Sequence, residues 1–219
     1  MVVAGPIRSG TRQATGDLLG QRPEELREGV AANLRSLRVE RLDLVNLRLV
    51  GTGPGIALEE QLGALEDLRH AGKLDLIGLS NVDQAQVEIA LELVDVAEIQ
   101  NGYSVIDRQD ELLLEFAREH EIAFVPFFHL GSAFRGGSAR LAGEPAIVRV
   151  ANKHGATPTQ IALAWLLARY DRMLLIPGTS SVAHLDENMA ATEIELDDAD
   201  LAALDLVDHP NAGAASGRA

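Results

Sequence analysis

Short apolar runs alternate with longer amphipathic segments along this chain, and the pattern predicts six strands separated by helices. The first helix begins at Pro23, because Leu26, Val30 and Leu34 recur at the spacing of one helical face. The strands are predicted near residues 2–4, 42–47, 75–79, 97–100, 123–127 and 173–176. Such alternation is typical of βαβ units and a parallel sheet. It leaves open a doubly wound sheet and a barrel, although no G-x-G-x-x-G motif follows the first strand.

The later helices are predicted from their start signals and their apolar spacing. They are expected at 58–70, 83–93 and 110–120, and from Thr157, Ser181 and Asp197 onward. Thr157-Pro158-Thr159-Gln160 has the form of a capping box. Two sets of residues are expected to face the core: Leu112, Leu113 and Phe116 in the helix at 110–120, and Val182, Leu185 and Met189 after Ser181. The Gly- and Ser-rich residues 129–143 are predicted to form a loop.

Composition narrows the class of protein. With 219 residues, of which 47% are hydrophobic, the chain can bury a sizeable core, and we expect one domain over 1–208 with a disordered tail over 209–219. The net charge of −14 opposes nucleic-acid binding, which depends on cationic side chains. No apolar run is long enough to span a membrane. The absence of cysteine excludes a thiolate metal site, no metal is expected, and a cytoplasmic location fits.

Polar residues gather where the predicted strands end. Ser80 and Asn81 follow the third strand, Gln100 the fourth and His129 the fifth. In a parallel α/β fold these carboxyl ends face the ligand, so the residues are candidates for one shared binding surface. The alternative is that Ser80, Asn81 and Asp83 cap the helix that follows them, as these residue types commonly do.

The segment Ile176-Pro177-Gly178-Thr179-Ser180-Ser181 enters the helix that begins near Ser181. A loop of Gly, Thr and Ser at a helix start offers backbone N–H groups and hydroxyls to an anion. The sequence therefore predicts a phosphate-binding site here, although no lysine accompanies it.

Four motifs, in this order, resemble the NADP(H)-dependent aldo-keto reductases. They are Gly78-Leu79-Ser80-Asn81, Gln100-Asn101, Ala164-Trp165-Leu166-Leu167 and Ile176-Pro177-Gly178-Thr179-Ser180-Ser181, together with Leu42-Asp43-Leu44-Val45-Asn46-Leu47-Arg48. The branch that the chain most resembles contains pyridoxal reductase-like oxidoreductases. The resemblance implies an α/β fold, a (β/α)8 TIM barrel, here incomplete because the first two βα units are missing.

The resemblance also implies which residues bind the cofactor. Ser80, Asn81 and Gln100 would hold the nicotinamide carboxamide, and Phe127 would stack on the nicotinamide ring. The remaining positions fall in the region of the adenosine 2′-phosphate: Gly178, Thr179, Ser180, Ser181, His184 and Asn188. Since relatives carry Lys or Arg at some of these positions, NAD is an alternative to NADP(H). The substrate would be a small aldehyde or ketone, of the pyridoxal type in this branch.

The family's proton donor is a Tyr beside a Lys, assisted by an Asp and a His, and this set is not matched. Gly5-Pro6 stands where the Lys is expected, and Arg48 where the His is expected. Arg48, Tyr103 and His129 are the candidate replacements. Three hypotheses follow. The chain is part of an NADPH-dependent carbonyl reductase whose first two units are not in this sequence, or it is a shortened pseudoenzyme or interaction subunit that binds the cofactor without turnover, or it is a degenerate fragment without activity. The open strand edges of an incomplete barrel would favour self-association or a covering partner.

Overall fold

A computed structural model describes residues 3–4, 22–49, 55–127, 129–130 and 137–207 of the chain. The chain divides into two compact units, with the boundary between Gln100 and Asn101. Each unit is described by itself below. Whether they form the single domain expected over 1–208 stays a prediction, and the tail at 209–219 lies outside the described residues.

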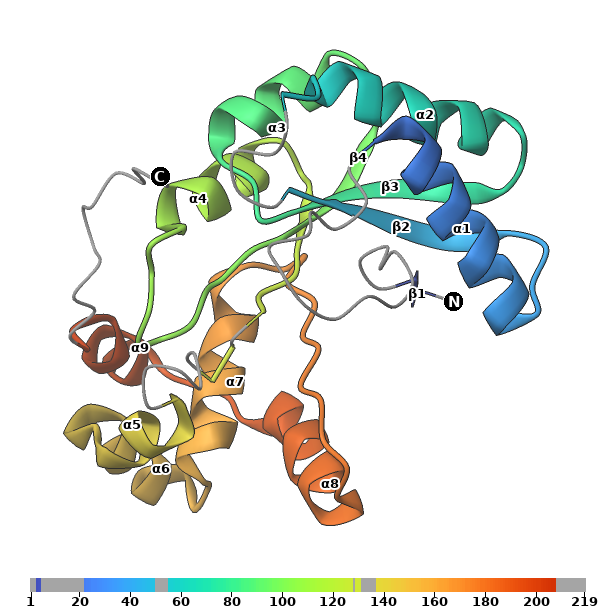
Figure 1. The fold of residues 1–219 in the computed structure, drawn as a ribbon. Coiled ribbons are helices and arrows are strands. Elements are labelled where there is room, and N and C mark those ends of the chain that lie inside the picture. The colour runs from blue at the N-terminus through green and yellow to red at the C-terminus, as the bar shows by residue number, and fades with distance from the viewer. Residues whose placement is uncertain (1–2, 5–21, 50–54, 128, 131–136, 208–219) are drawn as a thin grey trace. The chain divides into compact units, whose positions relative to one another are not determined.

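The first unit is a parallel sheet with helices along one face, as Figure 1 shows. Each strand pairs with the next one in the chain. The strands are β1 (Val3–Ala4), β2 (Leu42–Arg48), β3 (Leu74–Ser80) and β4 (Val96–Gln100), and the helices are α1 (Pro23–Leu37), α2 (Leu58–His70) and α3 (Gln84–Leu91). These elements confirm the predicted alternation in this half of the chain.

The two faces of this sheet differ in chemistry because side chains alternate along each strand. On one face Leu47, Leu79 and Ile99 are each at most 1% exposed. The buried face residues of the helices, such as Leu26 of α1 and Leu62 of α2, supply the other half of this core. The opposite face becomes polar toward the carboxyl ends of the strands, where a ligand surface was predicted.

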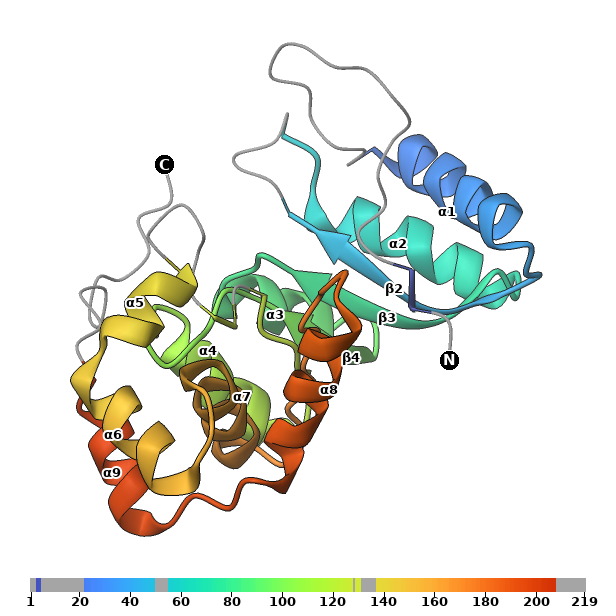
Figure 2. The ribbon, with the colours of Figure 1, turned by 90° about the horizontal axis from the view of Figure 1, so that it is seen from below.

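The second unit is mainly helical, as Figure 2 shows. Its elements are α4 (Glu111–Glu119), β5 (Ala123–Phe124), α5 (Gly137–Gly143), α6 (Pro145–His154), α7 (Pro158–Arg169), α8 (Val182–Ala190), the 3-10 helix Ala191–Glu193 and α9 (Asp198–Asp205). Helix α7 is its centre, since every residue from Ile161 to Leu166 is at most 4% exposed. Thr157 and Gln160 form the capping box predicted at its start.

Three predictions of secondary structure for this unit differ from the structure. Residues 173–176 form no strand: Met173 makes a single parallel bridge to Phe124, with Leu174 N donating to Phe124 O at 2.9 Å. The predicted strand at 123–127 is limited to two residues, although Phe127 bridges Gly102. Part of the predicted loop at 129–143 is helix α5.

Helix α8 turns its apolar stripe outward, contrary to the prediction. Val182 is 74% exposed, Leu185 48% and Met189 61%. The opposite side of the helix is held to the start of α7, where Thr157 Oγ1 donates to Glu187 Oε1 at 2.6 Å. Leu112 is likewise exposed, at 79%, rather than facing the core. Apolar spacing identified both helices. In α4 the other apolar residues, Leu113 and Phe116, are buried as predicted, whereas in α8 the stripe is only partly covered by the described residues.

A charged cluster joins α6 to α9. Lys153 Nζ lies 2.7 Å from Asp197 Oδ2 and 2.8 Å from Asp200 Oδ1, and His154 Nε2 lies 2.7 Å from Asp200 Oδ2. Burial alone would raise the pKa of the Asp200 carboxyl, but the hydrogen bonds from Lys153 and His154 outweigh it and lower that pKa to about 2. The cluster thus makes the ionised form of Asp200 part of the folded state.

Within the part of the chain that the structure describes, every helix is too short or too polar to traverse a bilayer.

We expect Asp200→Asn to lower the free energy of unfolding by about 2 kcal/mol at neutral pH, because it weakens charge-assisted bonds to Lys153 and His154. The folded-state pKa is depressed, so this stabilisation is present above the unfolded value of about 3.9 and is lost as pH falls toward about 2. Urea unfolding at several pH values measures it. The control is Asp198→Asn, an exposed acid in the first turn of α9. Equal losses in the two variants would contradict the cluster's role.

The outward stripe of α8 predicts a contrast between two identical substitutions. Leu185→Ala should cost less than about 1 kcal/mol of unfolding free energy, because half of that side chain already contacts solvent. Leu166→Ala should cost about 2–5 kcal/mol, because Leu166 is fully buried in α7. Chemical denaturation of both variants makes the comparison. A large loss in Leu185→Ala would mean that another surface covers the stripe in solution.

Candidate functional site

The carboxyl ends of β2, β3 and β4 place three predicted residues in one row. Arg48 pairs with Ser80 in the β2–β3 register, and Ser80 pairs with Gln100 in the β3–β4 register. All three stand on the sheet face opposite the apolar core, since they alternate with Leu47, Leu79 and Ile99. The first unit therefore brings Arg48, Ser80 and Gln100 together, as expected for groups at adjacent strand ends.

Ser80 is held in a defined state by its neighbour. Its side chain is completely buried, and Arg48 Nη1 donates to Ser80 Oγ at 3.0 Å. A guanidinium can only donate, so the hydroxyl must accept this bond. The Ser80 proton then points away from Arg48 and is left for another acceptor.

Asn81 takes an unusual backbone conformation at the point where β3 ends. Its φ is +58°, in the left-handed region that Asn tolerates better than most residues. Its backbone N–H donates to Gln100 O at 3.0 Å, and its side-chain Nδ2 donates to Leu49 O at 2.6 Å. The Asn81 amide is therefore fixed beside Ser80 by contacts to both neighbouring strands.

The helix-capping alternative applies to Asp83 and not to Ser80 or Asn81. Asp83 is the N-cap of α3: its carboxylate accepts from Gln86 N at 2.9 Å, and Gln86 Oε1 accepts from Asp83 N at 2.9 Å. Ser80 lies within β3, and its hydroxyl contacts Arg48. Because Asp83 satisfies the start of the helix, Ser80 and Asn81 are not needed for capping.

Two residues of this sheet that sequence reasoning missed are Asn46 and Glu98. Both lie on the same face as the row of strand-end residues, two positions earlier along β2 and β4, and both are buried. Asn46 Nδ2 donates to Glu98 Oε1 at 2.8 Å. The sequence signal that could have found them is a polar side chain in the middle of a mainly apolar strand, Asn46 in β2 and Glu98 in β4.

The second unit holds the other predicted cofactor residues. Phe127 lies against Gly102, where an added Cβ would come within 3.1 Å of the Phe127 ring. Gly178, Thr179 and Ser180 are exposed and lead into α8, whose N-cap is Ser181. Thr179 Oγ1 accepts from Ser181 N at 3.1 Å, and Ser181 Oγ accepts from His184 N at 3.4 Å. Two of the hydroxyls predicted to bind phosphate thus also organise the turn.

Tyr103 is a residue of the buried core of this unit. Its side chain is 1% exposed and its hydroxyl donates to Glu111 Oε2 at 2.8 Å. The ring stacks on Trp165, with 5.8 Å between ring centroids. Burial, with the charge of Glu111 adding to it, raises the pKa of Tyr103. A phenol in this environment releases its proton less readily than a free Tyr.

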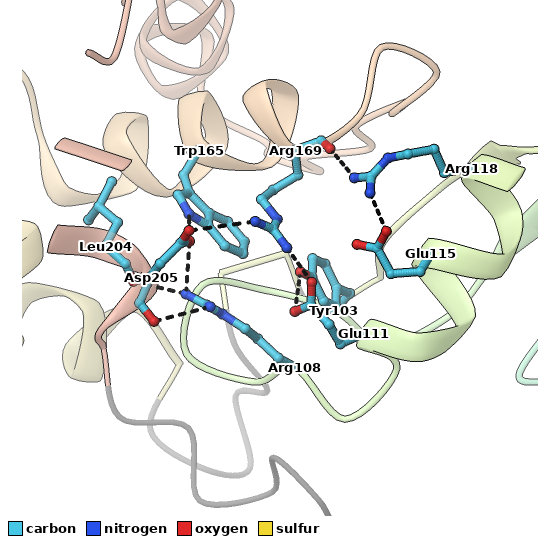
Figure 3. A network of polar contacts seen from close by, with 9 residues as sticks. All are labelled: Tyr103, Arg108, Glu111, Glu115, Arg118, Trp165, Arg169, Leu204 and Asp205. Atoms are coloured by element: carbon cyan, nitrogen blue, oxygen red, sulfur yellow. Dashed lines mark hydrogen bonds and ion pairs between the residues drawn. The ribbon is translucent and has the colours of Figure 1, made fainter. Parts of the chain in front are cut away.

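Figure 3 shows the polar network around Trp165 that fixes Tyr103 in place. The guanidinium groups of Arg108 and Arg169 lie 4.5 Å and 5.3 Å from the Trp165 ring centroid. Trp165 Nε1 donates to Asp205 Oδ1 at 3.0 Å. Arg169 also contacts the Glu111 carboxylate that accepts from Tyr103. These bonds connect α4, α7 and α9, so the contacts drawn around Tyr103 are structural ones.

His129 is the remaining candidate replacement, and the two lysines of the sequence are the residues that could assist a Tyr. His129 is buried, and burial lowers the pKa of its ring more than the hydrogen bond to the Pro126 backbone raises it. Its neutral form is therefore favoured. Lys153 is engaged by Asp197 and Asp200, and Lys73 directly precedes β3, at the end of the strand opposite to Ser80. Neither lysine is among the residues that Tyr103 contacts in the described part of the chain.

Comparison with known proteins identifies relatives over most of the chain. A sequence model of the aldo/keto reductase family matches residues 17–209. The pyridoxine 4-dehydrogenase of Escherichia coli (strain K12) is 43% identical over 187 residues, which cover 84% of this chain and 63% of that protein. An uncharacterized oxidoreductase of Schizosaccharomyces pombe is 33% identical over 184 residues, which cover 84% of this chain and 58% of that protein. The chain thus spans about three fifths of these curated relatives.

Solved structures agree with this result. A thermostable aldo-keto reductase in complex with the inhibitor epalrestat has a TM-score of 0.77 and 31% identity, covering 86% of this chain and 68% of its own. An aldo/keto reductase from Klebsiella pneumoniae, solved with NADP and acetate, has a TM-score of 0.74 and 30% identity, covering 85% and 66%. The fold is therefore α/β and of the (β/α)8 barrel type, incomplete here, as predicted. This chain belongs to the aldo/keto reductase family.

Proposed function

We propose that this chain carries the nicotinamide-cofactor site of an aldo/keto reductase, in which Ser80, Asn81 and Gln100 hold the carboxamide. The observation that carries the proposal is the row at the ends of β2, β3 and β4. There Arg48 donates to the Ser80 hydroxyl oxygen, which leaves the hydroxyl proton for another acceptor, and the backbone of the two neighbouring strands holds Asn81. An amide has one acceptor and two donors, so hydroxyl and amide side chains are suitable partners. NADP(H) is the proposed cofactor, and the match to a relative solved with NADP supports it.

The surface at the start of α8 is the proposed site for the adenosine 2′-phosphate. Gly178, Thr179 and Ser180 are exposed there, and His184 and Asn188 follow one and two turns along the helix. Hydroxyls and helix N–H groups bind phosphate without needing a lysine. NAD remains the alternative, because the described part of this surface offers no Lys or Arg.

The proposed reaction is transfer of a hydride from the cofactor to a small aldehyde or ketone. The cofactor supplies the hydride, and the protein must position it and deliver a proton to the carbonyl oxygen. The 43% identity to a pyridoxine 4-dehydrogenase supports a pyridoxal-like substrate. The chain's own residues account for binding and orientation better than for the proton, since Tyr103 and Lys153 are both engaged elsewhere.

The alternative is a protein that binds the cofactor without turnover, as a pseudoenzyme or interaction subunit. The burial of Tyr103 against Glu111 favours this reading. Self-association, a partner that covers the strand edges, and a cytoplasmic location stay predictions.

A calorimetric titration of the full chain with NADPH tests the binding site. We expect saturable binding that Ser80→Ala weakens about tenfold, because the donor to the carboxamide oxygen is lost. Ser36→Ala is the matched control, since Ser36 is exposed on α1. Titrations with NADH, and titrations of His184→Ala with NADPH, report on the proposed 2′-phosphate surface. Binding that is absent, or indifferent to Ser80→Ala, contradicts the proposal.

Addition of pyridoxal or a simple aldehyde to the NADPH complex separates enzyme from pseudoenzyme. A positioned general acid contributes about 10²–10⁴-fold to such reactions, so we expect turnover slower by that factor than in relatives with a Tyr–Lys pair. Any residual rate should survive Tyr103→Phe, because the Tyr103 hydroxyl is committed to Glu111. The measurement is oxidation of NADPH followed by absorbance. A rate abolished by Tyr103→Phe in a folded variant would assign Tyr103 as the acid.

A further inference from the structure

A second polar row lies one layer beneath the strand-end residues of the first unit. Asn46 pairs with Gly78 in the β2–β3 register, and Gly78 pairs with Glu98 in the β3–β4 register. Asn46 is 1% exposed and Glu98 is 6% exposed. Their side chains meet across the middle strand, where Asn46 Nδ2 donates to Glu98 Oε1 at 2.8 Å. The bond therefore joins β2 to β4 through the space above Gly78.

Gly78 is the residue that makes this contact possible. A Cβ added to it would overlap Asn46 Oδ1, closer than real side chains ever approach, and would lie 2.8 Å from Glu98 Cγ. Gly78 is in an ordinary extended strand, so glycine is required here for space and not for backbone freedom. The space that a side chain at position 78 would fill is taken by the side chains of Asn46 and Glu98.

The hydrogen-bonding capacity of the pair indicates the protonation state of Glu98. Asn46 Oδ1 is buried without a hydrogen-bond partner among the described residues. An ionised carboxylate only accepts and cannot serve this oxygen, whereas a carboxylic acid has one O–H to donate. A buried acceptor that stays unpaired costs about 1–3 kcal/mol. A neutral Glu98 can accept from Asn46 Nδ2 with one oxygen and donate to Oδ1 with the other.

The surroundings of Glu98 favour the neutral form as well. Burial raises the pKa of the Glu98 carboxyl, and the bond from Asn46 opposes this only in part. On this face of the sheet, β3 presents Leu74, Leu76, Gly78 and Ser80, none of which is ionisable, and the other side chain from β4 is Gln100. From β2 the ionisable group is Arg48, whose guanidinium contacts Ser80. Helices α1, α2 and α3 lie along the opposite face (Figure 1).

We propose that Glu98 is a positioning residue: a protonated carboxylic acid that joins β2 to β4 through Asn46 and so holds Ser80 and Gln100 in place for the cofactor. Ser80 and Gln100 follow Gly78 and Glu98 by two residues on the same face, so the lower row sets the spacing of the upper one. The proposal rests on the proposed cofactor site. Its new element is a buried acid that contacts neither cofactor nor substrate.

The proposal gives cofactor binding a pH dependence with a definite sign. Because the folded-state pKa of Glu98 is raised, its contribution is complete below the unfolded value and is lost as pH rises through the folded value. Deprotonation would set the carboxylate against Asn46 Oδ1, two acceptors without a proton between them. NADPH affinity and unfolding free energy should therefore both fall toward alkaline pH.

The test compares Glu98→Gln, Glu98→Ala and the control Glu28→Gln, which removes an exposed carboxylate from α1. Glutamine keeps the shape of the neutral acid and can both donate and accept. We expect Glu98→Gln to bind NADPH as wild type does at neutral pH and to lose the alkaline decline. Glu98→Ala should bind about tenfold more weakly, while Glu28→Gln should leave affinity and pH profile unchanged.

A second measurement is independent of the cofactor. In protein labelled with ¹³C-glutamate, the Glu98 carboxyl resonance, assigned by its absence in Glu98→Gln, should have the shift of a protonated acid at neutral pH. A chemical shift typical of an ionised carboxylate at neutral pH overturns the proposal. So does a loss of NADPH affinity in Glu98→Gln that equals the loss in Glu98→Ala. Wild-type affinity in Glu98→Ala overturns the positioning role. If wild type binds no NADPH, the proposed function and the positioning role fail together, while the carboxyl shift still decides whether the acid is protonated.

Discussion

The parallel register of β2, β3 and β4 is the constraint on which the candidate site of the first unit depends. The hydrogen-bonded ladder sets Arg48, Ser80 and Gln100 side by side, and two residues earlier it sets Asn46, Gly78 and Glu98 side by side. A shift of one residue in any strand would move its members to the apolar face. The buried residues Leu47, Leu79 and Ile99 on that face oppose such a shift. The hydrophobic core of the unit therefore fixes the positions of the polar groups.

The second unit stabilises its own residues by a different means. Trp165 stands at its centre, with Tyr103 stacked on the indole and the cations of Arg108 and Arg169 beside it. Each cation is also engaged by oxygen atoms, from Leu204, Asp205 or Glu111. Paired in this way, the charges tolerate burial that single charges would not. The segment Ala164–Leu166 is thus part of the core of the second unit.

The sequence predicted the first unit more completely than the second, for physical reasons. Alternating apolar runs and helix signals identified β2, β3, β4 and α1 to α3. The strand ends predicted that Ser80 and Gln100 lie side by side, which the register shows, while their part in cofactor binding stays a prediction. Residues 137–143, rich in Gly and Ser, suggested a loop, yet they form α5 because tertiary context outweighs propensity. The spacing of Val182, Leu185 and Met189 predicted a helix correctly. It could not show which way the stripe faces, since that depends on whether another surface covers it. The Asn46–Glu98 bond was missed because it connects strands that are not neighbours, across a glycine.

Gly78 has a consequence for how this family can vary. Three positions on three different strands share a volume that holds two side chains, so none of them is free to change alone. A relative with alanine at the position of Gly78 needs a shorter residue at that of Asn46 or Glu98, and a relative with two small residues there has room for a larger one between them. Among aligned sequences the three columns should therefore covary as a triplet, with total side-chain volume conserved while each residue changes.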